Sequence, residues 1–312
     1  MTEIATSATS PDLDKPVVVT GANGFVGSYV CHALIERGAS VRAVVRREGT
    51  APDLEGLTEF VGDFTDAEVA TQACAGAGVV VHTVHPMGEE DGAQQQSVQW
   101  SAQLAEAARE ADVPLFVHVS TTSVYERKQD TGDVDEFSAL SPDDDNEYAV
   151  TKRDTDLALA EVDGLTRVLV RPTAILGPGE SSIWNTLRPK DIRDNEDART
   201  EDPERTFGWL HVRDLADLIA DLATGRIPTA TDSMDGPVAG AATPVNAVSG
   251  NRRLREYIGP VCAAVGVEPI WTEPRGFRAD LVAERARSWG WTPKVTFEEA
   301  IDELLAGLTD LT

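Results

Sequence analysis

A tyrosine and a lysine four residues apart, Tyr148 and Lys152, form the pair in this sequence best suited to moving a proton. In a helix, residues at this spacing share a face, so the lysine ammonium can approach the tyrosine hydroxyl. A nearby positive charge stabilises the phenolate and lowers the tyrosine pKa from its usual value of about 10. Tyr148 could then donate and accept a proton near neutral pH, although exposed surface pairs have the same spacing.

A cluster of hydroxyl residues, Ser120 to Ser123, directly follows the apolar run 115–119, which is expected to be a strand. In parallel α/β sheets ligands bind beyond the carboxyl ends of the strands. Hydroxyl groups at this edge can hydrogen-bond a substrate oxygen as charge develops on it. The same residues could instead form a turn or a helix cap.

Three glycines, Gly21, Gly24 and Gly27, follow three consecutive valines and precede an apolar segment of helical length. Such a strand–glycine–helix unit suits a dinucleotide. The first glycine allows a tight turn, the second lets a pyrophosphate approach the backbone, and the third lets the helix pack closely on the strand. The helix N-terminus then offers free N–H groups and a positive dipole end to the diphosphate. A glycine-rich turn without a ligand is the simpler alternative.

Alternating patterns place these motifs in an α/β fold with a doubly wound parallel sheet (Rossmann) and a smaller mixed C-terminal substrate lobe. Residues 1–15 are expected to be a mobile tail, 16–175 a dinucleotide-binding domain, and 176–312 a substrate lobe interleaved with the last sheet strands. Expected strands are 17–20, 40–45, 58–61, 78–82, 115–119 and 165–170, and expected helices are 67–75, 94–111, 145–162, 212–224, 252–265, 278–288 and 297–308.

The 312-residue chain carries a formal charge of −26 and only five lysines. This charge disfavours nucleic acid and anionic membranes as partners. It is typical of a halophilic surface, although repulsion of acidic substrates or a cationic partner would also explain it. The polar N-terminus lacks the apolar segment of a secretory signal, and no apolar run is long enough for a membrane span. Three scattered cysteines indicate neither a metal site nor disulfides, so a cytoplasmic location is expected.

Taken together, the motifs resemble the extended short-chain dehydrogenase/reductase family, also called the NAD(P)-dependent epimerase/dehydratase family. Residues 20–27 match its glycine motif, 120–125 its Ser-Ser/Thr-x-x-Val-Tyr element, and Tyr148 with Lys152 its Tyr-x-x-x-Lys pair. Gly62-Asp63-Phe64, residues 170–179, 211–214 and 289–294 match further segments. The resemblance runs from about Pro16 to about Leu308 and is far more specific than any single motif.

The resemblance implies that Tyr148 passes the proton, Lys152 also holds the nicotinamide ribose, and Thr121 orients the substrate oxygen. It implies a nicotinamide cofactor and a homodimer formed through helices 94–111 and 145–162. The residues expected to contact the cofactor are Gly21, Asn23, Gly24, Phe25, Val26, Gly27, Arg46, Asp63, Phe64, Thr83, Val84, His85, Tyr148, Lys152 and Pro172.

Two arginines decide the expected cofactor. NAD-preferring members usually carry an acidic residue at the end of the second strand, where this sequence has Arg46 and Arg47. Arginines there would bind the 2′-phosphate of NADP by charge-assisted hydrogen bonds. We therefore predict NADP. NAD is not excluded, because the two arginines could simply balance Glu48 and Asp53.

The expected reaction is hydride transfer to or from a small carbonyl or alcohol. Residues 80–87 look like the dihydroflavonol reductase-like and 3β-hydroxysteroid dehydrogenase-like branches, with His85 replacing a small residue. No metal is expected at His82 and His85. The asparagine usual after the sixth strand in nucleotide-sugar epimerases is missing at Thr173, and an Asp-Glu pair of dehydratases is replaced by Thr122-Ser123.

A sugar or nucleotide-sugar epimerase with tightly bound NAD remains the alternative, and a redox-sensing binding protein is a third. Residues 180–206 are expected to form the substrate wall. Four of them could hold an anionic or aromatic group, or serve only packing and surface charge: Trp184, Arg188, Lys190 and Arg193.

Overall fold

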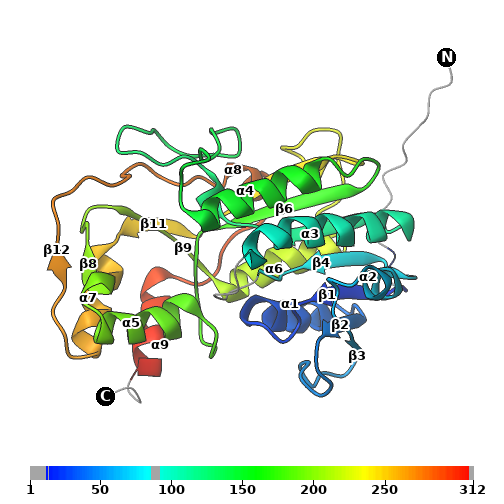
Figure 1. Ribbon diagram of the computed structural model, residues 1–312, viewed down its shortest axis with the longest axis horizontal. Coiled ribbons are helices and arrows are strands. Elements are labelled where there is room, and N and C mark those ends of the chain that lie inside the picture. The colour runs from blue at the N-terminus through cyan, green and yellow to red at the C-terminus, as the bar shows by residue number, and fades with distance from the viewer. Residues whose placement is uncertain (1–11, 13, 86–91, 309–312) are drawn as a thin grey trace.

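A seven-stranded parallel sheet, in the order β10-β6-β5-β4-β1-β2-β3, forms the larger part of the molecule (Figure 1). The computed structural model describes residues 12, 14–85 and 92–308. Most of the predicted tail, and Pro86 and Met87 of the segment 80–87, lie outside the described residues. The strands are β1 (Val17–Thr20), β2 (Val41–Val45), β3 (Leu57–Val61), β4 (Val79–His82), β5 (Leu115–Val119), β6 (Thr166–Pro172) and β10 (Ala242–Ala247).

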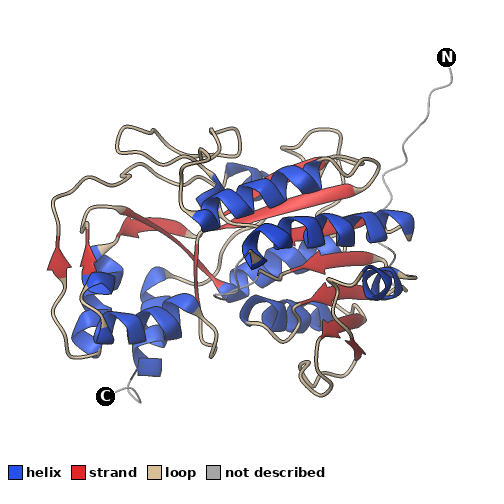
Figure 2. Ribbon diagram, viewed as in Figure 1, coloured by secondary structure: helices blue, strands red, loops and turns tan. Residues whose placement is uncertain are grey.

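Helices cover both faces of this sheet (Figure 2). On one face lie α1 (Phe25–Glu36) and α6 (Val212–Ala223), and on the other α2 (Ala67–Cys74), α3 (Ala93–Glu110) and α4 (Glu147–Ala160). Along β1, Val17 and Val19 pack into the core beneath α1, whereas Val18 packs into the opposite core. The valine runs are buried on both sides, as the sequence predicted for parallel strands. The doubly wound α/β fold is confirmed.

The smaller part lies to the left in Figure 1 and has its own core. It contains a three-stranded sheet of order β11-β9-β7 and the two-stranded pair β12-β8. Its elements are β7 (Ala174–Leu176), β8 (Thr200–Glu201), β9 (Thr206–His211), β11 (Gly250–Arg253), β12 (Ile270–Trp271), α5 (Arg188–Asp194), α7 (Arg255–Ala264) and α9 (Phe297–Leu308), with the short helical turns η2 (Ile183–Leu187) and η3 (Asp197–Arg199). The helix α8 (Glu284–Ser288) and the turn η1 (Thr122–Val124) belong to the larger part, where α8 packs against β10 and η1 against α4.

The chain passes more than once between the two parts. Both α6 and β10 lie beyond residue 176 in sequence, yet α6 packs against α1 and β10 pairs with β6 in the large sheet. The division at residues 175 and 176 therefore stays a prediction about folding units. None of the helices among the described residues is long and apolar enough to cross a membrane.

The helix predicted at 278–288 is wrong for its first six residues. Only Glu284–Ser288 is helical. The preceding segment is extended because Val134 donates to the carbonyl of Asp280 at 2.8 Å and accepts from the Val282 amide at 2.9 Å. Likewise, residues 252 and 253 of the predicted helix 252–265 belong to strand β11. In both places long-range hydrogen bonds override the local helical pattern.

Candidate functional site

The glycine turn between β1 and α1 has room only for glycine at two positions. Gly21 has a φ of +72°, and a Cβ on Gly27 would lie 2.1 Å from the carbonyl oxygen of Gly21. Helix α1 begins after Gly24 with no side-chain cap and no acidic residue in its first turn. By contrast, Asp66 caps α2 and Asn146 caps α4. The first N–H groups of α1 are thus left for an anion.

A cleft of about 1260 Å³ extends from this glycine turn over the strand ends into the smaller part. Every residue predicted for catalysis or cofactor binding lines this cleft, except Lys152. The positions come from six loops of the large sheet, which supports the expectation that they act together. Lys152 is only 4% exposed and lies buried next to the lining residues.

Tyr148 lies in the first turn of α4, where the Asn146 side chain accepts a hydrogen bond from the Ala149 amide at 3.0 Å. The side chain of Thr121 acts on the Tyr148 hydroxyl in the direction that lowers its pKa. The Thr121 oxygen also accepts from the Ser123 amide at 3.1 Å, so this threonine serves as a helix cap as well as a cleft residue. The ring of His85 packs edge-to-face on the Tyr148 ring, with centroids 5.1 Å apart.

The pKa of Tyr148 is raised, contrary to the lowering that we expected from Lys152. Although 38% of Tyr148 is exposed toward the cleft, desolvation by the surrounding protein raises its pKa, and only the side chain of Thr121 and the charge of Arg127 act to lower it. The Lys152 ammonium instead donates to the carbonyl of Val119 at 3.0 Å. Tyr148 is therefore protonated at neutral pH and ready to donate its proton.

The environment of Lys152 disfavours its charged form. Burial lowers its pKa to about 8, and the charge of Asp156 opposes this shift. Asp156 lies one further helical turn along α4, so Tyr148, Lys152 and Asp156 repeat at intervals of four on one face. The sequence analysis missed Asp156, although this spacing was a usable signal.

Asp156 belongs to a buried network that joins α4 to β6. Its carboxylate accepts from Arg171 Nε at 2.9 Å, and the two side chains are 2% and 6% exposed. Arg171 also donates to the hydroxyl of Tyr125 at 2.7 Å, and Tyr125 donates to Asn246 of β10 at 2.9 Å. Burial raises the pKa of Asp156, while Arg171, Ser120 and Lys152 act in the opposite direction.

Three histidines, His82, His85 and His118, form a histidine cluster beside Lys152, in which His82 and His118 are buried and His85 is half-buried. Burial and then the charge of Lys152 lower the pKa of His82 and of His85 to about 3, and the pKa of His118 falls for the same reasons. His82 bonds to Thr20 Oγ1 at 2.7 Å, and its ring stacks on His118 at 5.3 Å. The histidines are therefore neutral. Among the described residues, no group of three or more histidine, cysteine, aspartate or glutamate side chains is arranged so that it could hold a metal ion.

The two arginines after β2 face the end of the cleft expected to hold the adenosine. Arg46 and Arg47 are exposed, line the cleft, and make no ion pair within the described part of the chain. The loop beside them is fixed by Glu59, whose carboxylate accepts from the amides of residues 49–51. The alternative explanation was that Glu48 and Asp53 balance the charges of Arg46 and Arg47, and no ion pair between these residues supports it.

At the other end, the predicted substrate wall is only partly realised. Trp184 lines the cleft, whereas Arg188, Lys190 and Arg193 do not. Arg188 is bound to Glu201 at 2.5 Å and lies over the Trp184 ring at 5.3 Å. Two other arginines, which the sequence analysis did not single out, line the cleft here and are considered below: Arg127 and Arg205.

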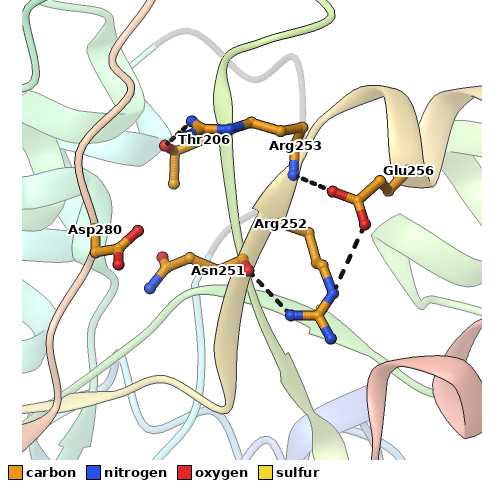
Figure 3. Close-up of a pocket in the computed structure, with 6 residues that line it drawn as sticks. All are labelled: Thr206, Asn251, Arg252, Arg253, Glu256 and Asp280. Carbon is orange, nitrogen blue, oxygen red and sulfur yellow. Dashed lines mark hydrogen bonds and ion pairs between the residues drawn. The ribbon is translucent and has the colours of Figure 1, made fainter.

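A second, smaller cavity of about 140 Å³ lies at β11 (Figure 3). Arg253 crosses it and donates to Thr206 Oγ1 at 3.2 Å and to the carbonyls of Glu204 and Arg278 at 3.2 and 3.0 Å. Its backbone amide bonds to Glu256 at 2.8 Å. Because most of its polar side chains, apart from Asp280, already bond to neighbouring protein groups, we interpret this cavity as a structural junction of β9, β11 and the extended segment near residue 280.

The sequence model of the NAD dependent epimerase/dehydratase family matches residues 17–226. The chain is 30% identical over 184 residues to a 3-beta-hydroxysteroid dehydrogenase of Mycolicibacterium neoaurum, covering 55% of this chain and 50% of that protein. It is 30% identical over 176 residues to a 2-alkyl-3-oxoalkanoate reductase of Stenotrophomonas maltophilia, covering 54% and 53%. The chain thus spans about half the length of the curated relatives it matches.

Among solved structures, the UDP-glucose 4-epimerase of Thermus thermophilus in complex with NAD matches with a TM-score of 0.71 at 20% identity. The match covers 95% of this chain and 100% of that chain. At this identity the likeness establishes the fold, including the smaller part.

Proposed function

We propose that this chain, which belongs to the NAD dependent epimerase/dehydratase family, is an NAD(P)-dependent oxidoreductase that transfers a hydride to or from a small carbonyl or alcohol. The family predicted from the motifs is thereby confirmed, and the reaction is our proposal. The observation that carries it is that Tyr148 and Thr121 line one cleft together with the glycine turn.

The cleft fits a dinucleotide. The uncapped start of α1 and the close approach at Gly27 form a cradle for a diphosphate, and the strand ends beside it would hold the nicotinamide. When bound, the nicotinamide supplies or accepts the hydride. The protein then has to orient a substrate oxygen and move one proton.

Tyr148 supplies that proton. Its raised pKa keeps the hydroxyl protonated at neutral pH, so it can donate to a carbonyl oxygen as negative charge develops there. Thr121 offers a second hydroxyl to the same oxygen. Once Tyr148 has lost its proton, the Lys152 ammonium on the same face of α4 would stabilise the phenolate.

NADP is the cofactor that the charges favour. Arg46 and Arg47 line the cleft without a carboxylate partner in the described residues. A 2′-phosphate would supply the missing negative charge. The Thermus epimerase is named in complex with NAD, so the preference is a property we assign to this chain's arginines.

The test is reduction of a panel of ketones with NADPH and NADH, followed by nicotinamide absorbance. Tyr148→Phe should lower kcat by about 10²–10⁴-fold and leave the fold unchanged by circular dichroism. If the purified chain instead retains NAD and shows no net turnover, it is an epimerase. If Tyr148→Phe equals the wild type in every assay, a redox-sensing binding protein becomes the better explanation.

The remaining expectations stand as proposals. α3 and α4 pack side by side, and Leu157 on α4 is 49% exposed, which suits a homodimer formed through these helices. Sedimentation analysis of Leu157→Glu would show dissociation if this face is the interface. The acidic composition supports a high-salt cytoplasm as the setting.

A further inference from the structure

Two positively charged side chains line the cleft near Tyr148. Arg127 follows the turn η1, and Arg205 lies in the turn before β9. Both are accessible from the cleft rather than sealed in the core. Desolvation and then the charge of Arg205 lower the pKa of Arg127, so the two guanidinium groups are close enough to repel each other.

Arg127 has no carboxylate within ion-pair distance among the described residues. Its side chain donates to Ser123 Oγ at 3.2 Å. Asp145 acts on it only from further away, and the Asp145 carboxylate accepts from the amide and the side chain of Asn146. Ser123 is neutral, so the charge of Arg127 is left uncompensated by any close partner.

The positive charge of Arg205 is only partly neutralised by a carboxylate. Arg205 bonds to Glu201 at 2.9 Å, but the other oxygen of the same carboxylate is bonded to Arg188. Thus Arg188 and Arg205 share one carboxylate, and Arg127 has none within ion-pair distance among the described residues. In a chain with 53 acidic residues and 27 basic ones, a concentration of positive charge is costly to the fold and points to a ligand.

An apolar wall adjoins the arginines. Ile183 lines the cleft with 42% of its surface exposed. Next to it Trp184 packs edge-to-face on Phe207, with ring centroids 5.1 Å apart. The combination of an apolar wall and two guanidinium groups suits a ligand with a carbon chain and an anionic end.

We propose that Arg127 and Arg205 bind a carboxylate or phosphate group of the substrate, while its carbon chain packs against Ile183 and Trp184. A planar guanidinium presents paired N–H groups that match two oxygens of such a group. The inference rests on the proposed oxidoreductase function, since the same substrate must place its carbonyl at Tyr148. It names the substrate class: an oxo acid, or a carbonyl compound bearing a phosphate.

The experiment compares 3-oxohexanoate with its ethyl ester, which keeps the carbonyl and chain but lacks the charge. Initial rates of NADPH oxidation are measured at constant ionic strength for the wild type, Arg127→Gln and Arg205→Gln. Arg226→Gln serves as a matched control, because Arg226 is 60% exposed just beyond the end of α6 and does not line the cleft. Arg127→Lys keeps the positive charge but loses the paired N–H groups of the guanidinium.

We expect the wild type to prefer the acid. Each glutamine variant should lower kcat/KM for the acid by about tenfold to one hundredfold, mainly through KM. This loss should exceed any change on the ester, for which Arg127 acts only through the pKa of Tyr148. Arg127→Lys should recover part of this loss. The control should match the wild type on both compounds. Equal losses on acid and ester, or no loss on the acid, would overturn the assignment while leaving the oxidoreductase proposal intact.

Calorimetric titration with 3-oxohexanoate, inorganic phosphate and UDP separates the two proposals. If no ketone is reduced but 3-oxohexanoate binds the wild type and not Arg127→Gln, the anion site stands and the oxidoreductase proposal fails. Arginine-dependent binding of phosphate and UDP alone would identify a phosphate as the anion. If none of the three probes shows arginine-dependent binding, the anion site is refuted.

Discussion

The buried pair of Asp156 and Arg171 gives the sharpest test of how the fold supports the catalytic helix. We consider Asp156→Asn, which keeps the shape of the side chain and removes its charge. The two side chains are 2% and 6% exposed and are joined at 2.9 Å. Removing one partner of such a pair leaves the other charge buried without a counter-charge, which lowers the free energy of unfolding by about 3–5 kcal/mol. For a chain of 312 residues, this lowers the unfolding temperature by roughly 5–8 °C.

The same substitution should also lower the pKa of Lys152. The charge of Asp156 raises the Lys152 pKa against the effect of burial, which has brought it to about 8. Without that charge the lysine loses its proton at lower pH. If the reaction needs the ammonium, the activity of the wild type falls above about pH 8, and in Asp156→Asn the fall begins about one pH unit lower.

Asp154→Asn is the matched control on the same helix. Asp154 is 42% exposed and pairs with Arg153 at 2.7 Å, so its loss should cost less than about 1 kcal/mol. Thermal unfolding and the pH dependence of kcat/KM are measured for both variants. Equal unfolding temperatures would refute the stability argument, and superimposable pH profiles would refute the link to Lys152.

Four further predictions follow from the same structure. Gly27→Ala should lose about 3 kcal/mol of unfolding free energy and all nucleotide binding, because the added Cβ overlaps the backbone oxygen of Gly21. The control is Gly259→Ala, whose added Cβ meets open space. In urea unfolding this control should be neutral or stabilising. Arg46→Ala should weaken NADPH binding about tenfold and spare NADH, with Arg226→Ala unchanged; equal effects on both cofactors would contradict the 2′-phosphate assignment. The histidine cluster stays neutral in the folded state but protonates in the unfolded chain below about pH 6.5, so the unfolding free energy should fall as the pH is lowered from there. His118→Phe should lessen that fall between pH 7 and 5 in urea titrations. The unfolding temperature should rise between about 0.1 M and 2 M KCl as self-repulsion is screened; no rise would argue against a halophilic surface.

The sequence predicted the elements of the large sheet closely because their signals are local. The strand Leu115–Val119 and the helix Phe297–Leu308 were placed with their observed bounds. Buried parallel strands are short apolar runs, and the glycines at 21 and 27 mark a turn that only glycine can form. In contrast, the segment before Glu284 has a helical pattern that loses to hydrogen bonds with Val134, a residue almost 150 positions away.

The candidate site likewise contains residues that local spacing in the sequence reveals and residues that only the folded chain brings together. The spacing of Tyr148 and Lys152 lies within one helix and was visible in the sequence. The network of Asp156, Arg171 and Tyr125 joins a helix, a strand and a loop, and only Asp156 carried a local signal.

What the sequence determined by itself is the family and the parallel sheet, since these depend on motifs within single turns of chain. The residues that would contact a dinucleotide stay a prediction from the same motifs. Tertiary structure alone decided the electrostatics. It pointed Lys152 at a backbone carbonyl, raised the pKa of Tyr148, and brought Arg127 and Arg205 to one cleft from positions 78 residues apart. A pKa and a charge cluster depend on distance and on the exclusion of water, and neither is set until the chain has folded.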